Sequence, residues 1–241
     1  MHKTLSTITT IELANICNLQ CLYCVSRFLV NHPNREPGIM DNETFERSLW
    51  VLQQCCDKGT QAEVNVNGTG ESCLDPQLPR RIRAVKDIMG DRQVQFCTNG
   101  LNMTKILAGN IKSAGIDRID ISVHNIYYAR KCAEIFADVG ITGIFSMGAL
   151  LTPHDWAGQL PAEYKPMVIH PMPCDPIIEG RGYISKEGSI SPCCFDYRLL
   201  GVFGTVFDDD IMDREVKPYE LCKTCHQVIP EIKPETKEKA A

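Results

Sequence analysis

The sequence predicts an α/β fold, a partial (β/α)6 TIM-like barrel followed by a small cysteine-rich domain, and three observations carry this prediction. Short β-type runs alternate with amphipathic helical stretches over the first two thirds of the chain. This alternation implies parallel strands joined by right-handed crossovers. Near residue 170 the pattern stops, prolines and glycines punctuate short segments, and five cysteines follow between Cys174 and Cys225. We therefore expect a barrel over 1–170, a second domain over 171–229 and a flexible charged tail over 230–241.

The expected elements follow in order along the chain. A β-branched run at 7–13 is the first strand, and Asp41 or Asn42 caps a helix whose apolar positions recur at i, i+4 and i+7. The remaining expected elements are strands at 62–67, 93–98, 118–123, 141–147 and 165–170, and helices at 78–89, 103–115 and 127–140. Single α/β barrels of about this size are common, so one main domain with a small appendage also fits the length.

The composition limits the cellular compartments and the kinds of binding partner that we expect for this protein. The net charge of −5 supplies no overall basic field for a polyanion, so nucleic-acid binding would need a local patch. The chain begins with a polar segment and has no run of about 18 apolar residues, so we expect a cytoplasmic protein with no membrane partner. In a reducing compartment its 13 cysteines indicate metal ligation rather than disulfides.

Three of these cysteines lie close together in the segment CNLQCLYC, directly after the first strand. Chemistry in parallel α/β barrels sits at the carboxyl ends of the strands, and this loop lies there. Zinc prefers four ligands, whereas three thiolates on an iron–sulfur cubane leave one iron open for a substrate. The spacing of Cys17, Cys21 and Cys24, with the aromatic Tyr23, resembles the Cys-x3-Cys-x-aromatic-Cys signature of the radical S-adenosylmethionine (SAM) enzymes.

This resemblance implies a [4Fe–4S] cluster on the three cysteines and further residues that bind SAM. Gly70 and Glu71 follow the second strand as the family's glycine–glutamate element does, although Thr69 interrupts the usual double glycine; an ordinary turn with a solvated Glu71 is the alternative. The other cofactor-binding candidates are Tyr23, Asn99 in the turn CTNG, Ser122 and His124 after the fourth strand, and Ser146 on the fifth. A structural role for His124 stays open.

A second cysteine set has the pattern Cys-x18-Cys-Cys-x27-Cys-x2-Cys. A Cys-x2-Cys pair brings two thiolates to one metal from a tight turn, and either zinc or an iron–sulfur cluster satisfies this arrangement. The segment resembles the SPASM domain or shorter twitch subdomain, a β-hairpin plus helix, that follows many radical SAM barrels. Its cysteines suffice for one auxiliary [4Fe–4S] cluster on Cys174, Cys193, Cys222 and Cys225, with Cys194 as a packing residue or alternate ligand.

The resemblance also implies a mechanism. The enzyme would cleave SAM reductively to a 5′-deoxyadenosyl radical, which takes a hydrogen atom from a small-molecule or modified-nucleotide substrate. The auxiliary cluster would accept an electron, giving net oxidation as in the radical SAM alcohol dehydrogenases of aminoglycoside biosynthesis. Arg27 and Asp196 are the catalytic candidates, although salt-bridging is the competing interpretation for each. A flavodoxin- or ferredoxin-type protein would supply electrons, and we expect a monomer or weak dimer.

Three other functions stay open. The chain could crosslink or epimerise a ribosomal peptide, which we disfavour because only a few residues precede the first strand. It could rearrange a nucleotide or DNA base, as phage-type radical SAM isomerases are thought to do. It could also be a zinc-binding interaction module without catalysis.

The remaining cysteines and a basic run have structural interpretations. Cys55, Cys56 and Cys132 lie on expected helices as small buried hydrophobic residues. The run of basic residues at 80–86 is interpreted as a solvated helix face, with binding of an anionic substrate as the alternative.

Overall fold

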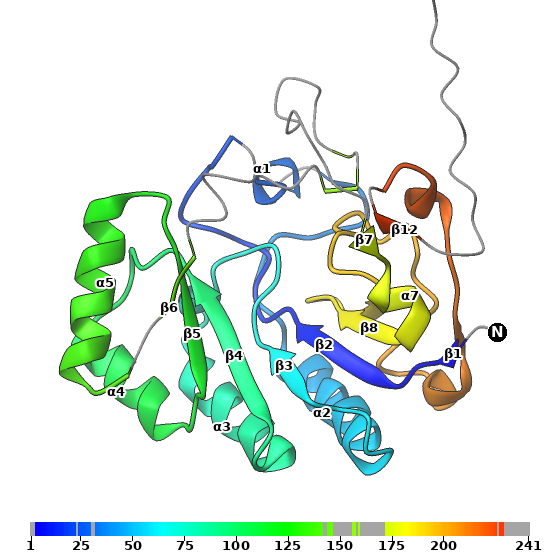
Figure 1. Cartoon of the computed structure of the whole chain (residues 1–241), viewed down its shortest axis with the longest axis horizontal. Helices are drawn as coiled ribbons and strands as arrows, with labels where there is room; N and C mark the ends of the chain where they lie inside the picture. Colours follow the sequence, from blue (N-terminus) through cyan, green and yellow to red (C-terminus); the bar gives the residue numbers. More distant parts are fainter. Residues whose placement is uncertain are drawn as a thin grey trace, which may run out of the picture.

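The computed structural model describes residues 3–22, 24–29, 32–141, 144–146, 156–157, 159, 172–225 and 227–228. Figure 1 shows these residues as one curved sheet with long helices on one side. The cysteine-rich segment, defined here as residues 172–225, lies beside the first strands of that sheet. None of the helices in the described residues has the length and apolarity needed to cross a membrane.

The main sheet has eight strands in the order β10-β9-β8-β2-β3-β4-β5-β6. They are β2 (Thr7–Ile11), β3 (Glu63–Asn65), β4 (Gln93–Thr98), β5 (Arg118–Ser122), β6 (Ile144–Ser146), β8 (Arg181–Ile184), β9 (Ser189–Ser191) and β10 (Gly204–Thr205). Every pair from β8 through β2 to β6 is parallel, and β9 and β10 are added antiparallel. The predicted α/β class with a mostly parallel sheet is therefore confirmed. The strand expected at 165–170 lies outside the described residues.

The long helices connect successive strands and lie on one side of the sheet (Figure 1). They are α2 (Asn42–Asp57), α3 (Leu78–Met89), α4 (Lys105–Ser113) and α5 (Ile126–Asp138). Asp41 caps α2, since its Oδ1 atom accepts a hydrogen bond of 2.7 Å from the Thr44 N–H. The capped helix predicted there is confirmed.

Apolar and polar side chains alternate along the strands, so the sheet has one apolar face and one polar face. Val64, Val94 and Ile119 are fully buried in the main core, whereas the neighbouring Gln95 and Asp120 are only partly buried. Successive strand residues point to opposite faces of a sheet. The apolar set packs under the helices, so polar side chains occupy the other face.

The cysteine-rich segment continues the main sheet of the barrel. Strand β8 pairs in parallel with β2, with Thr7 opposite Arg181, and Ile184 and Ile190 belong to the same core cluster as Ile8. The segment also contains β7 (Met172–Pro173), α7 (Asp175–Glu179), η3 (Ile211–Asp213), β11 (Glu215–Val216) and η4 (Glu220–Lys223). Strand β11 pairs with β1 (Lys3–Thr4), and β7 pairs with β12 (Gln227–Val228). The segment thus contains a β8–β9 hairpin and the short helix α7, and its assignment as a twitch subdomain stays a prediction.

Two interpretations of side chains on helices have different outcomes. Cys55, Cys56 and Cys132 are buried, as predicted. The prediction of a solvated basic face is wrong for Arg81, which is 2% exposed. Its Nε atom lies 3.2 Å from Oδ2 of Asp75. Asp75 neutralises the buried guanidinium, and the run of basic residues alone does not reveal that partner.

Candidate functional site

The first cysteine loop begins just after β2 and continues into the short helix α1 (Ser26–Leu29). The thiols of Cys17, Cys21 and Cys24 are all partly buried. Cys17 Sγ accepts hydrogen bonds from the Leu19 N–H, at 3.4 Å, and from Asn99 Nδ2, at 3.8 Å. Tyr23 lies outside the described residues.

The electrostatic surroundings of Cys17 include the other two thiols of the loop. Burial raises the pKa of Cys17, the Leu19 N–H opposes this rise, and the negative charges of Glu71, Cys24 and Cys21 add to it. Mutual repulsion makes it costly to ionise all three thiols together. A cationic metal centre relieves that repulsion, so the donor set fits an iron–sulfur cluster.

The Gly70–Glu71 turn fits tightly against the chain that leads into this loop. A Cβ atom on Gly70 would lie 2.4 Å from the carbonyl oxygen of Ile16 and 2.5 Å from that of Ala14. The Glu71 N–H donates to the Ile16 carbonyl at 2.8 Å. Glycine is therefore required here for close backbone approach.

Glu71 is 3% exposed, so the alternative of a solvated side chain is wrong. Its Oε1 atom accepts from the Cys73 N–H at 3.1 Å and from Thr98 Oγ1 at 2.9 Å. Its Oε2 atom accepts from the Asn99 N–H at 2.8 Å. The carboxylate is thus fixed between the turns after β3 and β4, and Oε2, which accepts one donor, can still accept another.

Thr69, which interrupts the double glycine, has a partner that the sequence did not reveal. Its N–H and Oγ1 both donate to Oε1 of Glu12, at 2.9 Å and 2.5 Å. A Cβ on Gly68 would lie 2.4 Å from Cγ of the same glutamate. Sequence reasoning missed Glu12; the available signal was an acidic residue directly after a β-branched strand.

Asn99 connects the turn after β4 to the cysteine loop. Besides its backbone bond to Glu71, its Nδ2 donates to Asn18 Oδ1 at 2.7 Å. Gly100 follows with φ +77°, and a Cβ there would lie 2.7 Å from Cys132 Cβ. The turn CTNG is therefore shaped by packing on α5 as well as by the site.

Ser122, His124 and Ser146 lie at the carboxyl edge of the last two strands. Ser122 is paired with Ser146 in the register of β5 and β6, and its carbonyl accepts from the His124 N–H at 3.0 Å. Burial lowers the pKa of His124, which favours its neutral form. These three candidates share the sheet edge with Asn99.

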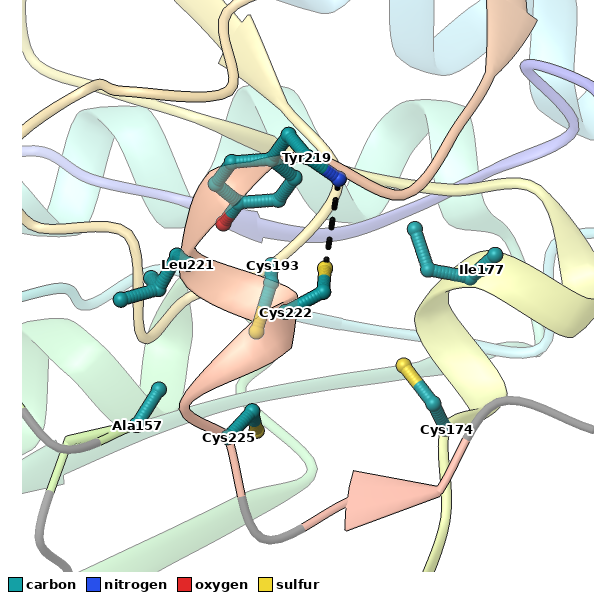
Figure 2. A pocket seen from close by; sticks show the side chains of 8 residues that line it. All are labelled: Ala157, Cys174, Ile177, Cys193, Tyr219, Leu221, Cys222 and Cys225. Atoms are coloured by element: carbon teal, nitrogen blue, oxygen red, sulfur yellow. Dashed lines mark hydrogen bonds between the residues drawn. The ribbon is translucent and has the colours of Figure 1, made fainter. Parts of the chain in front are cut away.

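The second cysteine set surrounds one cavity. Figure 2 shows side chains from α7, the loop after β9 and η4 converging on it. Its lining residues are Ala157, Cys174, Ile177, Cys193, Tyr219, Leu221, Cys222 and Cys225. Cys193 Sγ accepts from the Phe195 N–H at 3.4 Å, and Cys222 Sγ from the Tyr219 N–H at 3.5 Å. Four convergent thiols with backbone N–H donors suit a cluster that binds four cysteines.

The adjacent cysteines 193 and 194 have different environments. Cys193 lines the cavity, whereas Cys194 is exposed. A hydrogen bond between the two thiols, together with burial, raises the pKa of Cys193, and the same hydrogen bond lowers that of Cys194. The geometry therefore favours Cys193 as the residue directed at the cavity.

The two catalytic candidates make contacts within the fold. The Arg27 guanidinium lies 5.3 Å from the centre of the Phe28 ring. Asp196 is fully buried, and its carboxylate accepts from the N–H groups of Leu200 and Gly201, each at 2.8 Å. Burial raises the pKa of Asp196. A role in catalysis stays a prediction for both residues.

In the described part of the chain, no three His, Cys, Asp or Glu side chains are grouped around a position for a single metal ion.

The fold and the first cysteine loop define a class, namely α/β proteins with three cysteines at the carboxyl edge of a partial parallel barrel. A family model for the radical SAM superfamily matches residues 11–141, more than half of the chain. The chain therefore belongs to the radical SAM superfamily, a family of enzymes. Membership implies a [4Fe–4S] cluster and SAM as cofactors.

The curated relatives that this chain matches include GTP 3′,8-cyclases. A probable GTP 3′,8-cyclase of Saccharolobus islandicus (strain Y.N.15.51 / Yellowstone #2) is 34% identical over 117 residues, 48% of this chain and 34% of the relative. One from Metallosphaera sedula is 29% identical over 141 residues, 58% of this chain and 39% of the relative. The chain thus spans little more than a third of the length of these relatives.

Solved structures match over more of the chain. BtrN in complex with AdoMet and 2-DOIA superposes with a TM-score of 0.67 and 19% identity, covering 88% of this chain and 83% of BtrN. Native anSMEcpe with bound AdoMet gives a TM-score of 0.55 and 14% identity, covering 84% and 78%. These matches support the partial-barrel fold.

Proposed function

We propose that the chain is a radical SAM enzyme that oxidises a small polar molecule with the help of two [4Fe–4S] clusters. Cys17, Cys21 and Cys24 hold the first cluster. The observation that carries this proposal is the three-thiol loop bonded to the Glu71 and Asn99 turns at the carboxyl edge of the sheet.

The residues of that edge have distinct binding roles in this proposal. The Gly70 backbone and the Glu71 carboxylate receive the methionine amino group of SAM, because an anionic acceptor suits an ammonium donor. Asn99 orients the cysteine loop through its amide. Ser122, His124 and Ser146 supply polar contacts to the nucleoside part, and a neutral His124 can donate one hydrogen bond and accept another.

When bound, the reduced cluster and SAM supply a 5′-deoxyadenosyl radical that removes a hydrogen atom from the substrate. The protein's own contribution is to fix both reactants and exclude water. The buried Glu71 and the tightly packed turn around Gly70 serve that purpose, since neither can reorient without breaking several contacts.

The cysteine cavity supports the oxidative outcome. Cys174, Cys193, Cys222 and Cys225 line this cavity and would supply four ligands to a cluster, which would leave no iron open for a substrate. Its role is then electron transfer, and a substrate radical that gives up one electron and one proton is oxidised by two electrons overall. Partly buried polar residues on the face of the sheet opposite the long helices, such as Gln95 and Asp120, favour a polar substrate.

A nucleotide is the second candidate substrate. Two curated relatives are named probable GTP 3′,8-cyclases, and their similarity covers 48% and 58% of this chain. A nucleoside triphosphate and a non-nucleotide alcohol can be offered to the same preparation, and substrate-dependent consumption of one of them decides between the two.

The experiment that tests the proposed function is anaerobic reconstitution followed by iron, sulfide and product analysis. Two clusters require about eight irons per chain, and reduction with SAM should yield 5′-deoxyadenosine. Cys24→Ala should bind about four fewer irons per chain and form 5′-deoxyadenosine at least 100-fold more slowly. Cys194→Ala, the matched control at an exposed cysteine, should keep both. Zinc in place of iron, or product formed by Cys24→Ala at the normal rate, would contradict the proposal.

A further inference from the structure

A buried ion pair lies between the two cysteine sites. The side chains of Glu12 and Arg35 are both fully buried, and Arg35 Nη2 donates to Glu12 Oε2. Glu12 follows β2, five residues before Cys17, and Arg35 follows the loop and α1. The pair therefore joins the two ends of the segment that carries the first three cysteines.

The two oxygens of the Glu12 carboxylate accept hydrogen bonds from different parts of the chain. Oε1 accepts both Thr69 donors, at 2.9 Å from N–H and 2.5 Å from the hydroxyl. Oε2 accepts the Lys186 N–H at 3.0 Å in addition to Arg35. One buried charge thus fixes the turn that leads to Glu71 and the turn of the β8–β9 hairpin.

Arg35 extends the same network toward the second cysteine set. Its Nε donates to Glu187 Oε1 at 3.1 Å, and its Nη1 to the Tyr197 carbonyl at 2.9 Å. Tyr197 lies in the loop that follows Cys193. Asn15 adds a bond of 3.2 Å to the same Glu187 oxygen. A guanidinium offers donors in a rigid planar fork, so its three contacts share one geometry.

We propose that Glu12 and Arg35 are positioning residues that hold the SAM-binding turn in register with the hairpin leading to the second cysteine set. This inference rests on the proposed function. A buried pair is weak evidence for stability, since its desolvation offsets much of its attraction. Its bonds to three separate segments indicate that it determines their relative positions. Loss of the pair then weakens SAM binding while the cysteines still load iron.

The test titrates SAM into the reduced, reconstituted full chain and follows the EPR spectrum of the first cluster. Glu12→Gln keeps the side-chain shape but removes the charge, and we expect the SAM Kd to rise about tenfold at unchanged iron content. Asp117→Asn is the matched control. It also removes an ion-paired carboxylate, 2.7 Å from Lys86, but at the amino end of β5, so the SAM Kd should change less than twofold.

A second pair of variants covers the case in which Glu12→Gln does not fold. Thr69→Val removes only the hydroxyl donor and leaves the ion pair intact, and Thr69→Ser restores the hydroxyl. We expect the SAM Kd to rise about fivefold for Thr69→Val and to stay near the original for Thr69→Ser. Equal Kd values for the unaltered chain, Glu12→Gln and Thr69→Val would overturn the positioning role alone. An unaltered chain that loads no iron or binds no SAM would overturn the proposed function and this inference together.

Discussion

At the scale of single residues, each ligand thiol must lose a proton before it binds a metal. Burial raises the pKa of Cys17, and that of Cys222 to about 11, which disfavours the thiolate. Backbone N–H groups of Leu19 and Tyr219 donate to these same sulfur atoms and favour the thiolate. The positive charge of a bound metal favours the thiolate form, so metal binding and proton release are coupled.

Gly70→Ala tests how closely the backbone of the Gly70–Glu71 turn approaches its neighbours. Gly70→Ala places a methyl group within 2.5 Å of two carbonyl oxygens and should destabilise the fold by roughly 1–3 kcal/mol. Gly109→Ala is the control, because this glycine lies inside α4 with open space around its missing Cβ. That change should stabilise by about 0.5–1 kcal/mol through helix propensity.

Thermal unfolding of the two variants measures both effects, and SAM titration shows whether Gly70→Ala also loses binding. Equal stability of Gly70→Ala and the unaltered chain would mean that the turn does not pack against residues 14–16 as described.

At the scale of secondary-structure elements, the cysteine-rich segment has little structure of its own. Its strands are two to four residues long. Apart from what it shares with the barrel, a small cluster of Cys174, Ile177 and Val216 is its apolar core. Segments of this kind need a metal or disulfide to stay ordered. A cluster in the cavity would therefore link α7, the loop after β9 and η4.

This predicts that the second cluster orders its own segment selectively. Cys193→Ala should lose about four irons and show faster amide hydrogen exchange in α7, the loop after β9 and η4, with the barrel helices unchanged. Cys194→Ala, its sequence neighbour, should retain normal exchange because its thiol is exposed. If Cys194→Ala loses the iron and exchanges faster while Cys193→Ala does not, then Cys194 is the ligand.

At the scale of the whole molecule, the barrel and the cysteine-rich segment share one sheet and one core. Strand β8 covers the edge of β2, and Ile184, Ile190 and Val206 pack with Leu5 and Ile8. A Cβ on Gly182 would lie 2.8 Å from Leu5 Cδ1, so the strands are closely packed. An exposed edge strand is prone to aggregation.

A chain that ends at residue 170 should therefore not fold as an independent barrel. It exposes the β2 edge and the apolar residues that β8 and β9 cover, so we expect insoluble or non-cooperatively unfolding protein. Size-exclusion chromatography and thermal unfolding check this. A monomeric fragment with a cooperative transition would show that the two parts are separate folding units.

The sequence by itself determined the order of strands and helices and the radical SAM identity. Hydrophobic periodicity and a cysteine spacing are local signals, so α3 and β4 have the predicted bounds and α2 begins at the predicted cap. The burial of Glu71 and Arg81, the parallel pairing of β8 with β2, and the Glu12–Arg35 pair were decided by the tertiary structure. Each depends on partners distant in the chain, such as Lys186 for Glu12, and single-sequence patterns carry no information about which distant groups meet.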